Sequence, residues 1–264
     1  MLKVTSARVL AIGFLAATGF TATLLADHSW GSYHWARTSN PFTLKVGDNV
    51  SSVWDPYLAG AASDWSGSSV LDLTVVAGRT RPRTCKATLG RIEACSERYG
   101  STGWLGIAQI WISGVHIVQA TTKVNDTYFN TATYNKPAWR RLVMCQEIAH
   151  DFGLDHQDEE FDNANLGSCM DYTNAPDSNQ YPNAHDFEQL ELIYTHLDAT
   201  STVDSTASAM PPAMGQIAFD TRAQWGRLIR SSANGRAQLY ELDFGRGNKV
   251  VTHVFWADPD ADAR

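Results

Sequence analysis

Residues 146–156, QEIAHDFGLDH, constrain the local fold more than any other part of this sequence. Gln146 and His150 are four residues apart, so on a helix they project from one face, one turn apart. Gly153 can take the conformation that ends a helix and turns the chain. His156 follows three residues later and can return toward His150. The spacing therefore predicts a helix, a glycine turn and a cluster of Gln146, His150 and His156.

These residue types suit a catalytic zinc site. Zinc in such sites takes three protein ligands and keeps one position open for water, whose pKa it lowers to about 7. Glu147 stands beside the first ligand position, where its carboxylate can take a proton from that water. Downstream, Met170 lies in a turn-like stretch and is expected to form a hydrophobic floor beneath the site. Tyr172 is either a fifth ligand, a hydrogen-bond donor to an oxyanion, or a packed side chain.

This pattern resembles the metzincin clan of zinc peptidases, H-E-x-x-H-x-x-G-x-x-H followed by a Met-containing turn. The chain departs from it at Gln146, which stands in place of the first histidine, and matches it at Glu147, His150, Gly153, His156 and Met170. Three further stretches look like parts of matrixin-type domains: the end of the first helix, the cleft-lining edge strand and the start of the last helix, at residues 61–66, 103–112 and 186–194. The resemblance covers roughly residues 30–197. The spacing of Met170 and Tyr172 is similar to the turns of astacin- and serralysin-type members, in which the tyrosine lies near the metal.

Three interpretations of Gln146 stay open. Its amide oxygen can coordinate zinc with His150 and His156, as a neutral and weaker donor than imidazole. Alternatively, another side chain completes the site; the nearest in sequence are Asp151, Asp155 and His185. In the third interpretation the metal is lost and the fold has become a binding module. We expect the first, because Glu147 still stands beside two correctly spaced histidines.

The resemblance implies a secreted zinc-dependent endopeptidase with Glu147 as general base. An extended protein or peptide substrate is expected to pair with the strand at 106–112. The alternative is a catalytically silent secreted binding protein on the same scaffold. We expect a monomer. Calcium is conceivable at the acidic run 155–162, but the run lacks the spacing of a loop site.

The remaining histidines lack ligand spacing. We expect them to lie at the surface or to be satisfied inside the protein; they are His28, His34, His116, His196 and His253.

Apolar periodicity predicts an α+β domain. Helices are expected at 49–65, 137–153 and 186–197, and strands at 71–76, 106–112 and 116–124. The family resemblance adds a mixed twisted sheet, an active-site helix and a C-terminal helix after the Met turn. The predicted domain spans 27–198, followed by a linker at 199–213 rich in Ala, Ser, Thr and Pro. Residues 214–264 contain a β-hairpin signal around 245–248 and are expected to pack on the domain, since a lone hairpin is unstable.

The N-terminus predicts export. Lys3 and Arg8 precede an apolar stretch that ends at Ala26, which is typical of a secretory signal peptide at residues 1–26. The alternative is an uncleaved membrane anchor. After removal of the signal we expect no stable membrane association. The formal net charge of −7, without a basic run, argues against nucleic-acid binding.

The four cysteines also fit an extracellular or periplasmic location. Pairing close in sequence predicts disulfides Cys85–Cys95 and Cys145–Cys169, and the alternative is four free thiols.

Overall fold

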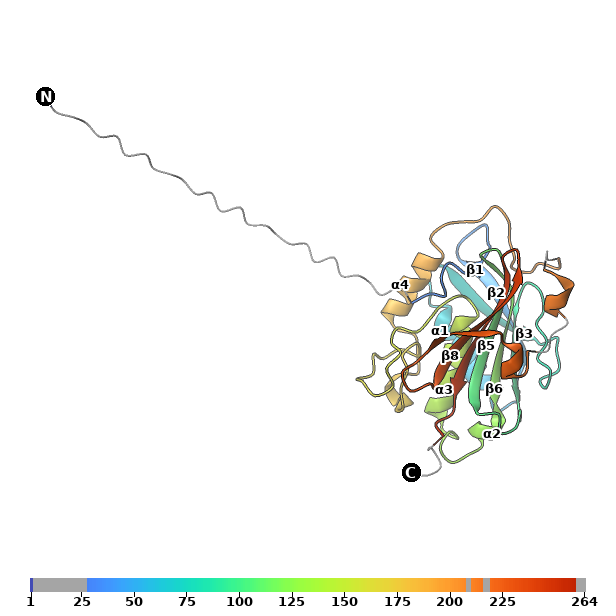
Figure 1. Cartoon of the computed structure of the whole chain (residues 1–264), viewed down its shortest axis with the longest axis vertical. Coiled ribbons are helices and arrows are strands. Elements are labelled where there is room, and N and C mark those ends of the chain that lie inside the picture. Colours follow the sequence, from blue (N-terminus) through green and yellow to red (C-terminus); the bar gives the residue numbers. More distant parts are fainter. Residues whose placement is uncertain (2–27, 208–209, 216–218, 260–264) are drawn as a thin grey trace.

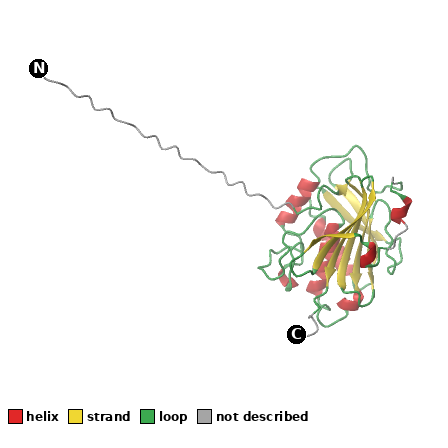
Figure 2. Cartoon of the chain, viewed as in Figure 1, coloured by secondary structure: helices red, strands yellow, loops and turns green. Residues whose placement is uncertain are grey.

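A computed structural model describes Met1 and residues 28–207, 210–215 and 219–259. These residues form an α+β structure around one nine-stranded mixed sheet in the order β3-β2-β4-β6-β5-β9-β8-β7, with β1 beside β6 (Figures 1 and 2). The α+β class is therefore confirmed. The predicted signal peptide lies outside the described residues, apart from Met1. Among the described residues no helix has the length and apolar character needed to cross a membrane.

The first half of the sheet comes from the N-terminal part of the chain. Its strands are β1 (His34–Trp35), β2 (Phe42–Asn49), β3 (Leu71–Ala77), β4 (Ile92–Glu97), β5 (Trp104–Ser113) and β6 (His116–Asn125). Strands β2, β3, β4 and β6 are parallel, whereas β5 runs antiparallel to β6. Nearly every residue of β5 and β6 is buried. Burial on both faces means that layers cover the sheet on both sides here.

The described residues form four α-helices, and the first and third of them cover one face of the sheet. They are α1 (Asp55–Trp65), the short α2 (Asp126–Phe129), α3 (Pro137–His150) and α4 (Ala184–Ile193), with a 3-10 turn, η1 (Pro176–Ser178). Helix α1 packs on α3, where the Trp65 indole donates to the Cys145 carbonyl at 3.0 Å. Asn183 caps α4 through a reciprocal pair of hydrogen bonds with Asp186.

The predicted start of the first helix at residue 49 is wrong. Asn49 ends strand β2, and the helix begins only at Asp55. The Asn49 amide donates to Glu93 Oε2 at 2.7 Å, and β2 pairs with both β3 and β4. These long-range bonds outweigh the local helical spacing of the apolar residues.

The C-terminal segment extends the sheet. Strands β7 (Arg227–Ser231), β8 (Ala237–Gly245) and β9 (Asn248–Trp256) are antiparallel, and β8 and β9 lie where the sequence predicted a hairpin. Strand β9 pairs with β5 over residues 104–113. The expectation that residues 103–112 form a free edge strand is therefore wrong, because β5 is bonded to β6 on one side and to β9 on the other.

The same segment covers the sheet face opposite the helices. Short 3-10 turns, η2 (Pro212–Gly215) and η3 (Arg222–Gln224), bring apolar side chains onto β5 and β6. The resulting second core contains Trp104, Ile107, Trp111, Val118, Met214, Phe219, Trp225, Tyr240, Val250 and Val254. Upstream, the segment around 199–207 bonds to the domain: the amides of Thr202 and Asp204 donate to the carbonyls of Ala36 and Gly90.

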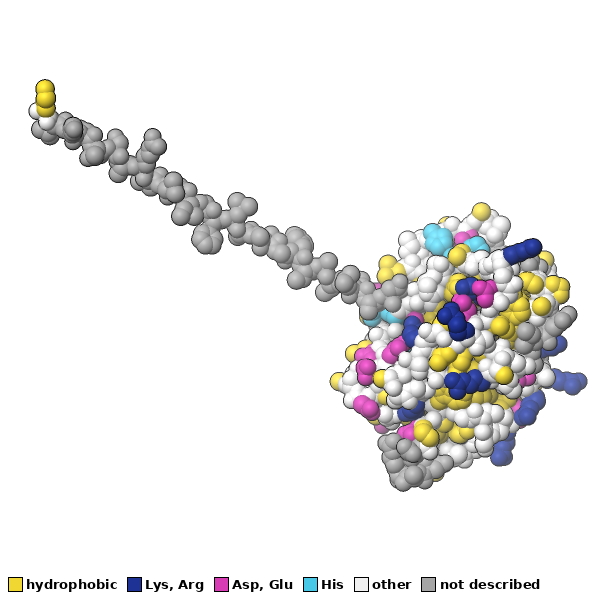
Figure 3. All heavy atoms as spheres, in the orientation of Figure 1, with side chains coloured by type: hydrophobic (Ala, Val, Ile, Leu, Met, Phe, Trp, Pro, Cys, Tyr) yellow, Lys and Arg dark blue, Asp and Glu magenta, His cyan; other side chains and the backbone are white. Residues whose placement is uncertain are grey.

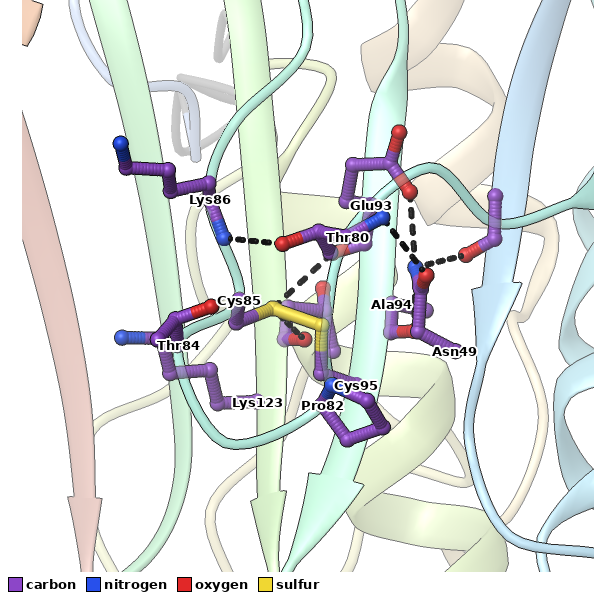
Figure 4. The surroundings of a disulfide bond; sticks show 12 residues. Asn49, Thr80, Pro82, Thr84, Cys85, Lys86, Glu93, Ala94, Cys95 and Lys123 are labelled. Atoms are coloured by element: carbon purple, nitrogen blue, oxygen red, sulfur yellow. Dashed lines mark hydrogen bonds between the residues drawn. A yellow bond between two sulfur atoms is a disulfide. The ribbon is translucent and has the colours of Figure 1, made fainter.

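Both predicted disulfides are confirmed. Cys85–Cys95 ties the loop at residues 80–86 to β4 (Figure 4), and Cys145–Cys169 ties α3 to the chain just before Met170. Structural disulfides are typical of proteins in oxidising compartments. The surface in Figure 3 carries side chains of both charge signs with apolar atoms between them, rather than one large basic field.

Candidate metal centre

Helix α3 and the turn after it bring two histidines together. The helix ends at His150, and Gly153 then takes a φ of +97°. A Cβ on Gly153 would lie 2.4 Å from the carbonyl oxygen of Tyr33, so the turn needs glycine for both conformation and space. Beyond it the chain reverses, and His156 Nε2 lies 3.2 Å from His150 Nε2. The predicted helix, turn and return are present.

A third histidine enters from the C-terminal hairpin. His253 on β9 is buried, and its ring lies among potential metal ligands, whereas we expected a histidine at the surface or satisfied inside the protein. Its ring lies 4.2 Å from that of His150 and 4.9 Å from that of His156. One ligand atom from each of the three histidines lies within 4.8 Å of the others. The three therefore form a cluster compatible with a metal ion.

No spacing rule could have found His253, because it lies 106 residues after Glu147. A weaker signal was present. Residues alternate along a strand, so His253 shares a face of β9 with Val251 and Phe255, which belong to the main core. The opposite face carries Val250 and Val254, which belong to the second core. A polar histidine among core residues of a predicted strand indicates a side chain that points into the protein and has a functional role.

The protonation of the cluster suits a cation. His150 Nδ1 lies 2.8 Å from the Leu154 carbonyl, which can only accept, so Nδ1 carries the hydrogen and Nε2 faces His156. Burial lowers the pKa of His150 and His156 well below the usual value, and that of His253 to about 3. Neutral imidazoles present lone pairs to their surroundings, and a shared metal ion is the partner such lone pairs favour.

Glu147 and Tyr172 both contact His253. Glu147 Oε2 lies 3.1 Å from His253 Nδ1, and Tyr172 Oη lies 3.1 Å from His253 Nε2. Complete burial raises the pKa of Glu147 well above its usual value. The Tyr172 ring packs on that of His156 at 3.8 Å, and Trp30 stacks on His150 at 4.7 Å. The base, the tyrosine and the three histidines thus form one buried group.

Gln146 lies on α3 one helical turn before His150, and its side-chain oxygen is unpaired in the described part of the chain. Its amide nitrogen donates to the Cys169 carbonyl at 3.0 Å, and Cys169 is bonded to Cys145, the residue before Gln146. Its Oε1 atom is buried and has no hydrogen-bond partner among the described residues. An unpaired buried carbonyl oxygen is costly, and coordination to a cation would remove that cost. Met170, the residue after Cys169, is fully buried.

The other candidates for a third ligand have partners outside the three-histidine group, although Asp151 Oδ1 is buried without one among the described residues and Asp155 Oδ1 lies 3.5 Å from His156 Nδ1. Asp151 Oδ2 accepts from the Thr122 hydroxyl at 2.7 Å, and Asp155 forms an ion pair with Arg230 of β7. His185 lies on α4, with its ring 4.8 Å from that of His28. In the acidic loop, Glu159 is bound to Arg230 at 2.8 Å. None of these residues is in the three-histidine cluster found among the described residues.

Searches with the whole sequence found no matching family model and no matching curated protein. Among solved structures, the chain is similar to high choriolytic enzyme 1, a hatching-enzyme zinc protease from the medaka fish Oryzias latipes. The TM-score is 0.35 at 12% identity, over 63% of this chain and 96% of that one. A TM-score this low does not by itself establish a shared fold or activity.

Proposed function

We propose that this protein is a secreted, metzincin-like zinc endopeptidase held in a latent state by its own C-terminal hairpin. One observation carries the proposal. Strand β9 pairs with β5, the strand expected to bind substrate, and the same strand inserts His253 among His150, His156 and Glu147. A peptide substrate of such a site adds a strand at an open sheet edge, and β9 occupies that edge.

The donor set fits zinc. Three imidazoles and the free amide oxygen of Gln146 are ligand types that zinc accepts in four-coordinate sites. In this proposal His150, His156 and Gln146 are the permanent ligands, and His253 takes the position that a catalytic site leaves open. When bound, zinc supplies Lewis-acid chemistry, polarising the scissile carbonyl and making water more acidic.

The chain's own residues supply the remaining functions. Glu147, once released from His253, takes a proton from water and delivers it to the leaving amine. Tyr172 donates a hydrogen bond to the developing oxyanion. Backbone groups of β5 hold the substrate extended.

The C-terminal segment can be displaced without breaking a disulfide. All four cysteines lie at or before Cys169, and both bonds are within that part of the chain. Thr221 and Arg222 lie in an exposed turn before β7. A cut there leaves the hairpin attached only by non-covalent contacts, so its release opens β5 and removes His253 together.

The experiment places a recognition sequence for a site-specific protease after Thr221. The uncut protein is expected to hydrolyse a casein substrate slowly, and the cut protein, with zinc present, faster. The control is the same protein carrying Glu147→Gln, a substitution that keeps the shape and removes the base. Its activity after cutting should fall by about 10²–10⁴ relative to the cut parent.

A second candidate is a catalytically silent zinc-stabilised binding protein. The observation that favours it is the burial of the cluster: His150 and Glu147 are 0% exposed, His253 2% and His156 6%. Closed sites of this kind are typical of structural zinc. If the cut parent is no more active than its Glu147→Gln control, the endopeptidase proposal is wrong and the silent protein is favoured.

A further inference from the structure

A second histidine cluster lies away from the candidate metal centre, around Asp198. His34 comes from β1, His116 begins β6, and His196 follows α4. Their Nε2 atoms lie 3.4, 3.2 and 3.6 Å from the same atom, Asp198 Oδ1. The rings of His116 and His196 lie 5.0 and 4.7 Å from that of His34, each nearly perpendicular to it. Exposed histidine atoms are visible at the end of the molecule where β1 lies (Figure 3).

These distances differ from those of ordinary ion pairs. A charge-assisted hydrogen bond from imidazolium to carboxylate is about 2.7–2.9 Å long, and all three contacts are longer. Three imidazolium groups with Arg37 would also put four positive charges around one carboxylate. Ligand atoms about 2.0–2.1 Å from a tetrahedral zinc ion are about 3.3 Å from one another. The separations from Asp198 Oδ1 are close to that tetrahedron edge, and the ligand atoms of His34, His116 and Asp198 all lie within 4.8 Å of one another, a group that does not include His196.

In His34 and Asp198, the side-chain atom that does not face this centre is already bonded. His34 Nδ1 lies 2.7 Å from the Ser32 carbonyl, so it carries the hydrogen and leaves Nε2 free to coordinate. Asp198 Oδ2 accepts from the Arg37 side chain at 2.9 Å and from the Arg37 amide at 3.2 Å. Arg37 also bonds to the carbonyl of His196. Outer partners of this kind fix the orientation of metal ligands.

We propose that His34, His116 and Asp198 hold a second zinc ion, structural in role, and that the exposed side chain of His196 turns to become its fourth ligand. It would join three segments that are distant in sequence: the stretch before β2, the start of β6 and the chain after α4. With His196 bound, four protein side chains would close the site, as in other structural zinc sites. His116 and His196 have 33% and 56% of their side chains exposed, so zinc can enter from solvent. This inference does not depend on the proposed peptidase function.

The test counts zinc in the full-length protein after dialysis against zinc chloride. The parent is expected to hold two zinc ions per chain, and His116→Ala/His196→Ala one. His185→Ala, which removes a partly exposed histidine outside both clusters, should keep two. His253→Ala should affect only the first site. If that first site binds no zinc, the parent holds one ion and the double variant none, so the two proposals fail separately.

A second measurement addresses the structural role. Zinc at about 100 times its dissociation constant should raise the thermal midpoint of His150→Ala/His156→Ala, which lacks the ligands of the first site, by roughly 5–10 °C through the second site alone. Adding His116→Ala/His196→Ala to that variant should abolish the rise, and His196→Ala alone should reduce it. Equal zinc content in the parent and the double variant, or a thermal shift that survives the added substitutions, would overturn the assignment.

Discussion

Arg230 joins the hairpin segment to the loop that carries His156. Its guanidinium bonds to both oxygens of Asp155, and its Nε lies 2.8 Å from Glu159 Oε1. The Arg230 side chain is 40% exposed, but that of Asp155 only 6%. We expect Arg230→Ala to favour opening of the C-terminal strands, because the closed state loses these bonds while the open state loses none.

The size of the effect follows from the exposure of each partner. The contact with Glu159 is solvent-screened and contributes about 0.2–1 kcal/mol. The bonds to Asp155 join charged groups at a partly buried site, where the net contribution is about 1.5 kcal/mol at the lower end. Together they come to about 2 kcal/mol, which is roughly a 30-fold change in the opening equilibrium.

Hydrogen exchange measures this opening without requiring catalysis. Amides that bond between β5 and β9 should exchange roughly 30-fold faster in Arg230→Ala, whereas those between β2 and β3 should change little. Lys249→Ala is the matched control, because Lys249 pairs at 3.0 Å with Glu241 of the same hairpin. Unchanged exchange at β5, or equal acceleration at β2 and β3, would refute the role of Arg230 as a latch.

Three further predictions concern the metal centre and the frame around it. Replacing both Cys145 and Cys169 by Ala removes a disulfide that closes a loop with a sequence separation of 24. The free energy of unfolding, measured by urea denaturation, should fall by about 3 kcal/mol. A loss below about 1 kcal/mol would contradict the loop-entropy reasoning. Gly106→Ala should lower the free energy of unfolding by about 1–3 kcal/mol, because its Cβ would lie 2.6 Å from Glu147 Oε1. Gly60→Ala is the control: nothing lies within 4 Å of its Cβ, so it should stabilise α1 by up to about 1 kcal/mol. Thermal melts that reverse this order would show the packing argument to be mistaken. Gln146→His should raise zinc affinity at least about tenfold in competition with a chromogenic chelator; equal affinities would mean that Gln146 does not touch the metal.

The sequence was informative where structure depends on neighbours in the chain. The helix through Gln146 and His150, the turn at Gly153 and the return of His156 all follow from spacings of three or four residues. Both disulfides also follow from proximity in sequence, and the structure has the pairs that this rule predicts.

Features that depend on strand pairing could not be predicted in the same way. Strands β2 and β4 were not predicted, because the strands that pair with them in parallel are distant in sequence. The open edge expected at β5 is occupied because β9 bonds to it, and that pairing also brings His253 to the metal centre. The same applies to His34, His116 and His196, which meet only because β1 pairs with β6 and the chain after α4 returns beside them.

The pairing of β5 with β9 also bears on how the chain matures. Translation at about 5–20 residues per second separates the emergence of His156 from that of His253 by several seconds. During that interval the apolar strand β5 has an unpaired edge, the kind of surface on which nascent chains aggregate. Any zinc captured then is held without the third histidine. The yield of soluble protein should therefore depend on how soon residues 248–256 reach β5 during synthesis.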